Sequence, residues 1–120
     1  MERLKEEIEW HFERFLKLIQ EQQDVVSENR RYGEDRRVRV EKGRVYWRIW
    51  VDEHDINLSE DSLLRSHVFG FVRIKDGAIL RAATWKAPET RTKSAVRGYV
   101  YDENVTDYFH EYGIRYAPTC

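Results

Sequence analysis

Apolar residues near the start of the chain recur at the spacing of one helical face. The spacing predicts a helix over residues 2–31, roughly 40–45 Å long at the 1.5 Å rise of an α-helix. Leu16 and Leu18 widen the apolar stripe, and this surplus favours a homodimer through the N-terminal helix. The positions that form the stripe itself are Leu4, Ile8, Phe12, Phe15, Ile19 and Val26.

The pattern then changes to period two, which is typical of strands. Residues 37–41 alternate, Lys42-Gly43 can turn the chain, and residues 44–51 alternate again. This succession predicts a β-hairpin. Its second strand carries Val45, Trp47, Ile49 and Val51 on one side, and Arg44, Tyr46, Arg48 and Trp50 on the other.

A second hairpin is expected from residues 67–74 and 78–85, because Asp76-Gly77 between them is a strong turn signal. Between the two hairpins, residues 52–61 are acidic. They are interpreted as a loop followed by a short helix capped at Ser59. Residues 95–101 favour a final strand through their valines and tyrosines.

Residues 105–112 are expected to form a short helix. Together these elements predict one α+β domain over residues 1–120, with the helix packed on an antiparallel sheet of four to five strands. The helix occupies residues 1–33, the sheet 36–101, and a short helix with a tail 102–120. The expected core consists of Leu4, Ile8, Phe12, Phe15, Trp47, Ile49, Val72 and Leu80.

Composition favours a folded protein with a dense ionic surface. Of the 120 residues, 41% are hydrophobic and 36% are charged, and the second figure exceeds the usual share. Cys120 is the only cysteine, so no intrachain disulfide or cysteine-based zinc site is expected. The acidic N-terminus is unlike a signal peptide, and no apolar run reaches the roughly 18 residues that cross a bilayer. We expect a cytoplasmic protein with no cofactor and no membrane partner.

Charge is unevenly distributed although the formal net charge is −1. Residues 36–48 and 73–97 are basic and carry interleaved aromatic rings, a combination typical of surfaces that bind single-stranded nucleic acid. The alternative is a half-solvated surface whose cations pair with the acidic segments. The expected nucleic-acid-binding residues are Arg44, Arg48, Arg81, Trp85, Lys86, Arg91, Lys93 and Arg97, with Tyr46, Trp50 and Tyr99 as further rings.

No local motif identifies an active site. His54 lies among acidic residues and His110 precedes Glu111, but neither spacing matches a known metal site. His67, with a carboxylate that the fold brings near it, is the remaining candidate for acid–base catalysis. The sequence therefore favours a binding protein over an enzyme. A small enzyme acting on a nucleotide or nucleic acid, and a module that binds another protein, stay open as alternatives.

Residues 75–88 end in Trp-Lys-Ala-Pro after the Asp-Gly turn. This stretch resembles a family of small uncharacterised bacteriophage and viral proteins, whose hairpin has the form G-D-x-[YL]-K-x-A-[SG]-W-K-A-P. The resemblance covers residues 44–101, because Phe71-Val72 and residues 96–100 match the entry and exit of that hairpin. Thr84 stands where the family has Ser or Gly.

The resemblance implies a viral or prophage accessory protein that works in the cytoplasm of its host. It implies no particular activity. In that setting the expected partners are single-stranded nucleic acid or a host protein.

Overall fold

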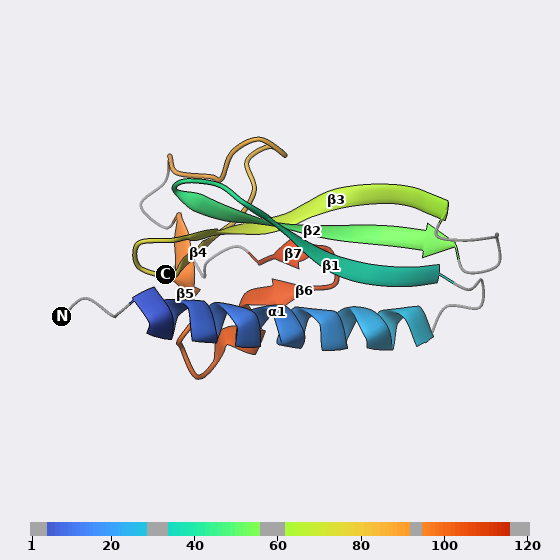
Figure 1. The fold of residues 1–120 in the computed structure, drawn as a ribbon, viewed down its shortest axis with the longest axis horizontal. Coiled ribbons are helices and arrows are strands. Elements are labelled where there is room, and N and C mark those ends of the chain that lie inside the picture. The colour runs from blue at the N-terminus through green and yellow to red at the C-terminus, as the bar shows by residue number, and fades with distance from the viewer. Residues whose placement is uncertain (1–4, 29–33, 56–61, 92–94, 116–120) are drawn as a thin grey trace.

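The computed structural model describes residues 5–28, 34–55, 62–91 and 95–115 as a helix packed on a five-stranded antiparallel sheet (Figure 1). Each strand of this sheet pairs with its neighbours in sequence, in the order β1-β2-β3-β4-β5. The predicted α+β fold is confirmed. The elements are α1 (Lys5–Glu28), β1 (Glu34–Lys42), β2 (Tyr46–Asp55), β3 (Ser62–Arg73), β4 (Ala78–Leu80), β5 (Val96–Tyr99), a 3-10 turn η1 (Val105–Tyr108), β6 (Phe109–His110) and β7 (Gly113–Ile114).

The core lies between α1 and one face of the sheet, which we call the inner face. Phe12 of α1 stacks on Trp47 of β2, with ring centroids 4.2 Å apart. Burying each side chain of this size stabilises the fold by about 1.5–3 kcal/mol. Leu4 lies outside the described residues, and the rest of the expected core is buried as predicted: Ile8, Phe12, Phe15, Trp47, Ile49, Val72 and Leu80.

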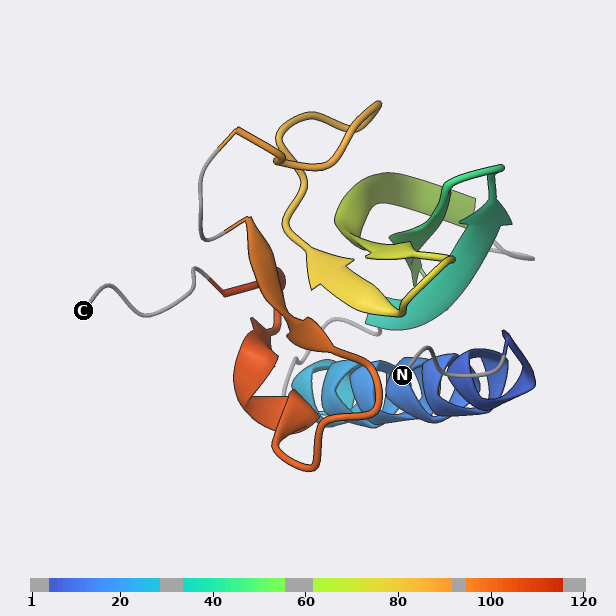
Figure 2. The ribbon, with the colours of Figure 1, turned by 90° about the vertical axis from the view of Figure 1, so that its left-hand side faces the viewer.

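The opposite, outer face of the sheet carries a smaller apolar cluster. Phe71 and Leu80 are buried there, and Tyr46 packs against them from β2. Beyond β4 the chain leaves the sheet and forms a loop over residues 81–91, which rises on the side away from the helix (Figure 2). An isolated bridge between Ala82 and Pro88 closes this 81–91 loop at its base.

One helix side chain pairs with the outer edge of β1. The Gln20 side-chain amide donates to the Arg36 carbonyl at 2.8 Å, and its carbonyl accepts from the Val38 N–H at 2.8 Å. Gln20 thus makes the two hydrogen bonds that a neighbouring strand would make. Edge strands attract unwanted pairing unless they are covered, and Gln20 covers one part of this edge.

The acidic segment after Val51 differs from its prediction. Asp52–Asp55 continue β2 and do not form a loop, and β3 already begins at Ser62. The reason is pairing with basic neighbours: Arg36 forms an ion pair with Glu53 at 3.0 Å, and Arg39 with Asp52 at 2.8 Å. The predicted cap at Ser59 lies outside the described residues.

The second hairpin turns at Asp76-Gly77 as predicted, with Gly77 at a φ of 76°. Its second strand is shorter than expected, because β4 ends at Leu80 where the 81–91 loop begins. The final strand is confirmed as β5. The short helix expected over residues 105–112 is instead the 3-10 turn η1 followed by the β6–β7 hairpin.

None of the helices in the described part of the chain combines the length and apolar character needed to cross a membrane.

Candidate nucleic-acid interface

Cations and aromatic rings alternate across the outer face of the sheet. The Arg39 guanidinium lies 5.0 Å from the centroid of the Trp50 ring. The Arg48 guanidinium lies 5.8 Å from the centroid of the same ring and 5.9 Å from that of the Trp85 ring. Lys86 Nζ completes the series at 5.2 Å from the Trp85 ring. We call this series, Arg39–Trp50–Arg48–Trp85–Lys86, the cation–aromatic ladder.

The strand periodicity explains half of the ladder. Arg48 and Trp50 are two residues apart on β2, so their side chains leave the same face. Arg39 of β1 lies opposite Trp50 in the antiparallel register. The other half comes from the 81–91 loop, which brings the Trp85 ring and the Lys86 carbonyl next to the Arg48 guanidinium.

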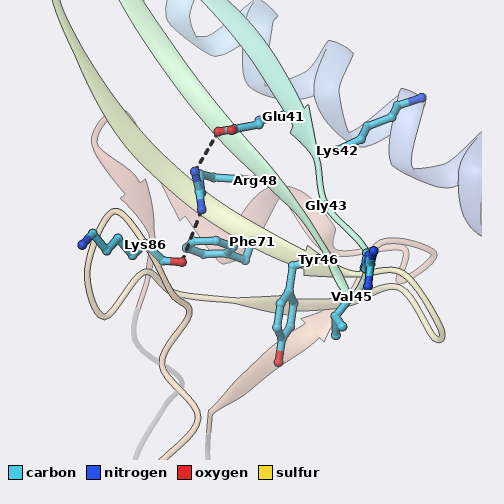
Figure 3. Close-up of a pocket in the computed structure, with 9 residues that line it drawn as sticks. Glu41, Lys42, Gly43, Val45, Tyr46, Arg48, Phe71 and Lys86 are labelled. Atoms are coloured by element: carbon cyan, nitrogen blue, oxygen red, sulfur yellow. Dashed lines mark hydrogen bonds and ion pairs between the residues drawn. The ribbon is translucent and has the colours of Figure 1, made fainter.

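Arg48 joins the sheet to the loop. Its Nη1 donates to Glu41 at 2.7 Å, and its Nη2 donates to the Lys86 backbone carbonyl at 3.3 Å (Figure 3). The Trp50 indole N–H donates to the same Glu41 oxygen at 3.0 Å. This hydrogen bond, together with the nearby guanidinium charges, holds the pKa of Glu41 below its usual range. Glu41 therefore stays ionised and fixes the orientation of both residues.

A pocket of about 260 Å³ opens beside Arg48, between the β1–β2 turn and the 81–91 loop. Tyr46 and Phe71 contribute aromatic walls, with ring centroids 6.1 Å apart. Arg44 and Lys86 line it as well, and no acidic side chain within the described ranges forms an ion pair with either. The ladder and Arg44 together are called the basic face below.

Trp85 is the most exposed ring of the basic face, with 58% of its surface accessible. The loop holds it there through local bonds: the Ala83 and Thr84 N–H groups donate to the Ala87 carbonyl, and Thr84 Oγ1 accepts from the Lys86 N–H at 3.1 Å. The Trp-Lys-Ala-Pro segment is thus a tight turn that presents its Trp, not a strand end.

Two of the predicted binding residues contact the C-terminal segment instead. Arg81 Nε donates to the Ile114 carbonyl at 3.0 Å. The Arg97 guanidinium lies 4.5 Å from the centre of the Tyr108 ring. Burial and a hydrogen bond to Asp102 raise the pKa of Tyr108 to about 12, so this phenol stays neutral. Arg81 therefore fastens β7 to the sheet, and Arg97 fastens η1.

The remaining predicted residues divide as follows. Arg44, Arg48, Trp85 and Lys86 lie together on the basic face. Arg91 is exposed at the end of the 81–91 loop, and Lys93 lies outside the described residues. Sequence reasoning missed Arg39 and Phe71. The Lys42-Gly43 turn could have revealed Arg39, because it sets a register that places Arg39 opposite Trp50.

The candidate acid–base residue His67 lies near Glu53 on the inner face. Burial lowers the pKa of His67. The Glu53 carboxylate is held by Arg36 at 3.0 Å and by Arg65, and these contacts outweigh its burial and lower its pKa. A carboxylate held by two guanidinium groups is a poor proton acceptor, so this cluster is suited to stability. Among the described residues there is no group of His, Cys, Asp or Glu that could hold a metal ion.

No protein-family model, curated protein or solved structure matches the chain. The resemblance of residues 44–101 to small phage and viral proteins stays a prediction, and the case for a function rests on the geometry above.

Proposed function

We propose that the protein binds single-stranded nucleic acid on its basic face. The observation that supports this is the cation–aromatic ladder, in which the exposed Trp85 lies beside Lys86, a cation with no acidic partner among the described residues. Arg39 and Arg48 of the ladder are paired with Asp52 and Glu41. Such a surface offers both components that a single strand needs, rings for its bases and cations for its phosphates.

Each group has a role in this proposal. Trp85 stacks on an unpaired base, a contact that contributes about 1–3 kcal/mol per base. Arg44 and Lys86 contact phosphates on either side of the pocket. Arg48 is a positioning residue, because its contacts with Glu41 and the Lys86 carbonyl fix the loop that carries Trp85.

A single strand fits this face better than a duplex. Stacking on a protein ring requires a base that is not already stacked in a helix. The basic face is a sheet surface with a loop above it, and no described helix projects from it to enter a major groove. Protein contacts to a single strand on such a surface are mainly to phosphates and base faces, so little sequence preference is expected.

The test is fluorescence anisotropy with labelled oligodeoxythymidine and oligouridine strands of about ten nucleotides, a typical site size. Trp85→Ala should weaken binding by about 5- to 150-fold, the equivalent of one stacked base. Trp10→Ala is the matched control, because Trp10 is similarly exposed on the helix. Absence of binding at low salt, or equal losses in both variants, would contradict the proposal.

Arg44→Ala should reduce the slope of log affinity against log salt by about 0.7, the value for one phosphate of a single strand. The matched control is Arg14→Ala, an exposed arginine on the helix.

From the resemblance of residues 44–101 we further propose that this binding serves a viral or prophage accessory role in a host cell. Purification without nuclease, followed by identification of the bound material, tests this part. Host protein in place of nucleic acid would favour the protein-binding alternative. The predicted homodimer also stays a prediction, and light scattering over a range of concentrations tests it.

A further inference from the structure

The edge of β1 is covered along only part of its length. Gln20 pairs with the Arg36 carbonyl and the Val38 N–H. Backbone groups of alternate residues in a strand point to the same side, so those of Val40 and Lys42 point to this edge as well. In the described part of the chain no strand lies beside β1 except β2. Among the described residues, the end of the edge next to the β1–β2 turn therefore has no strand paired with it on its outer side.

A groove of about 330 Å³ lies beneath this open part of the edge. Lys42 and Trp47 form its sheet side, and the side chain of Lys42 points toward α1 (Figure 3). The helix side is the first half of α1. We call this cavity the acidic groove, and it is lined by Glu6, Glu9, Trp10, Phe12, Glu13, Lys42 and Trp47.

The helical repeat explains why the acidic groove lies next to the part of the β1 edge that Gln20 covers. Glu6, Glu13 and Gln20 are seven residues apart, so they lie along one face of α1. Where this face is close to β1, Gln20 reaches the strand. Toward the start of α1 the hairpin of β1 and β2 rises away from the helix (Figure 1), and the same face borders the acidic groove.

We propose that the acidic groove binds an extended segment of a partner protein that carries lysine or arginine and pairs with β1 as an additional strand. Its main chain would bond to Val40 and Lys42, which is the usual way that peptides extend a sheet. Every second side chain of the segment would point down into the groove. There a cation meets the carboxylates of Glu9 and Glu13 and the face of Trp10, and the segment is fixed in register.

Charge argues for a basic partner and against a second copy of this chain. Trp10 is 63% exposed, and three of the groove residues are glutamates against one lysine. A cation that lies over an indole ring and next to carboxylates is stabilised by both the ring and the negative charges. A second copy paired about a two-fold axis at Val40 would bring both sets of glutamates into one groove, where they repel each other.

The test uses a dye-labelled heptapeptide of alternating Lys and Val, blocked at both ends, with anisotropy at low salt. The double variant Glu9→Gln, Glu13→Gln should weaken its binding about tenfold, because both carboxylates that meet the cation are neutralised. These glutamates are exposed, so the variant should fold. The same peptide with N-methyl groups on alternate amides cannot extend the sheet, and it should bind at least about tenfold more weakly.

Hydrogen exchange supplies the structural readout. Bound peptide should slow the exchange of the Val40 and Lys42 amides and leave that of Val38, already bonded to Gln20, little changed. The proposal is overturned if the peptide does not bind, if the glutamate variant or the N-methylated peptide binds equally well, or if sedimentation shows that the groove is occupied by a second copy. Oligonucleotide binding by the glutamate variant is measured in parallel and tests the basic face separately.

Discussion

Two exposed tryptophans on opposite sides of the sheet have opposite electrostatic surroundings. Trp85 is 58% exposed and lies beside Arg48 and Lys86, whereas Trp10 is 63% exposed and lies among glutamates of the acidic groove. The ring is the same, so the charges around it decide which ligand it can serve. The two proposals therefore assign an anion with flat rings to the first site and an organic cation to the second.

The comparison also explains why the overall charge is uninformative. The net charge of −1 balances 21 Lys and Arg residues against 22 Asp and Glu residues, and it hides the difference between a basic face and an acidic groove on opposite faces of the sheet. Trp47 and Arg48 are neighbours in β2, yet one lines the acidic groove and the other the basic pocket. Because neighbouring side chains of a strand point to opposite faces of the sheet, the alternation along β2 places acidic and basic surroundings on different faces.

The largest effect is expected from removing a buried core side chain that also lines the acidic groove. Phe12→Ala deletes the ring that stacks on Trp47, and a buried Phe to Ala change typically costs 3–5 kcal/mol, so we expect a loss of about 4 kcal/mol. Urea unfolding followed by circular dichroism measures it. Phe12→Leu should cost clearly less because it leaves a smaller cavity. Equal costs would show that Phe12 is not needed to fill the space between α1 and β2.

A reciprocal experiment sharpens the comparison directly. Trp85→Ala should reduce oligonucleotide affinity by about 1–3 kcal/mol and leave the affinity for the Lys–Val peptide unchanged. Trp10→Ala should do the reverse, with a smaller loss of about 0.5–2 kcal/mol from the cation–ring contact. Anisotropy with both probes gives the four values. If either variant weakens both ligands equally, the two sites are not independent.

The boundary of the acidic groove can be moved by one substitution. Gln20→Leu removes two hydrogen bonds to β1 and should lower the free energy of unfolding by about 1–2 kcal/mol. It also uncovers the Arg36 and Val38 backbone groups, so a longer Lys–Val peptide should gain affinity over the heptapeptide. Gln20→Glu is the control, since its carboxylate can accept from the Val38 N–H but cannot donate to the Arg36 carbonyl. No change in stability with Gln20→Leu would show that the edge bonds contribute little.

The smallest effect is a pH dependence that should spare both sites. Burial lowers the pKa of His67 in the folded state, although Glu53 and Asp52 act in the opposite direction and Arg36 and Arg65 in the same one. Near pH 6.5, the ordinary pKa of a histidine, the unfolded chain therefore binds more protons than the folded chain. The contribution of His67 to stability is full above that pH and is lost as the pH drops through the folded pKa. His67→Gln should flatten this part of the profile.

No histidine lines the basic pocket or the acidic groove, so oligonucleotide and peptide affinities should stay level over the same pH range. Urea unfolding and anisotropy at a series of pH values between neutral and mildly acidic provide the comparison. A parallel decline of binding and stability would point to a global change of the fold.

Patterns with a strong period were sufficient to predict the main layers. The apolar stripe of the helix and the alternation around Trp47 and Ile49 each allow a single orientation. Turning the opposite side of either element toward the core would bury its charged side chains. The strand at Asp52–Asp55 could not be predicted in this way. Its acidic residues become strand residues only once Arg36 lies opposite Glu53 and Arg39 reaches Asp52 from the position opposite Trp50, and that pairing depends on the register of β1.

Of the predicted site residues, Arg44, Arg48, Trp85 and Lys86 lie on the basic face, and Arg48 alone among these four belongs to a strand. The two-residue alternation is enough to place Arg44, Arg48 and the Tyr46 and Trp50 rings of β2 on one face. Arg81 and Arg97 are also arginines in a basic segment, and the sequence does not distinguish them from the residues of the basic face. What separates them is the return of the C-terminal segment to contact both, as the Ile114 carbonyl and the Tyr108 ring show. Local sequence contains no information on that long-range contact.

The position of Phe109 has a consequence for the order in which the chain is made. Its ring packs edge-on against Phe15 of α1 at 5.6 Å and against Phe69 of β3 at 5.9 Å, although it comes after all five strands of the main sheet. A nascent chain emerges from its N-terminus, so both partners leave the ribosome before the residue that joins them. Until synthesis passes residue 109, these two rings lack their common neighbour and leave apolar surface exposed to chaperones and proteases. The core thus distinguishes a finished chain from one that stopped early.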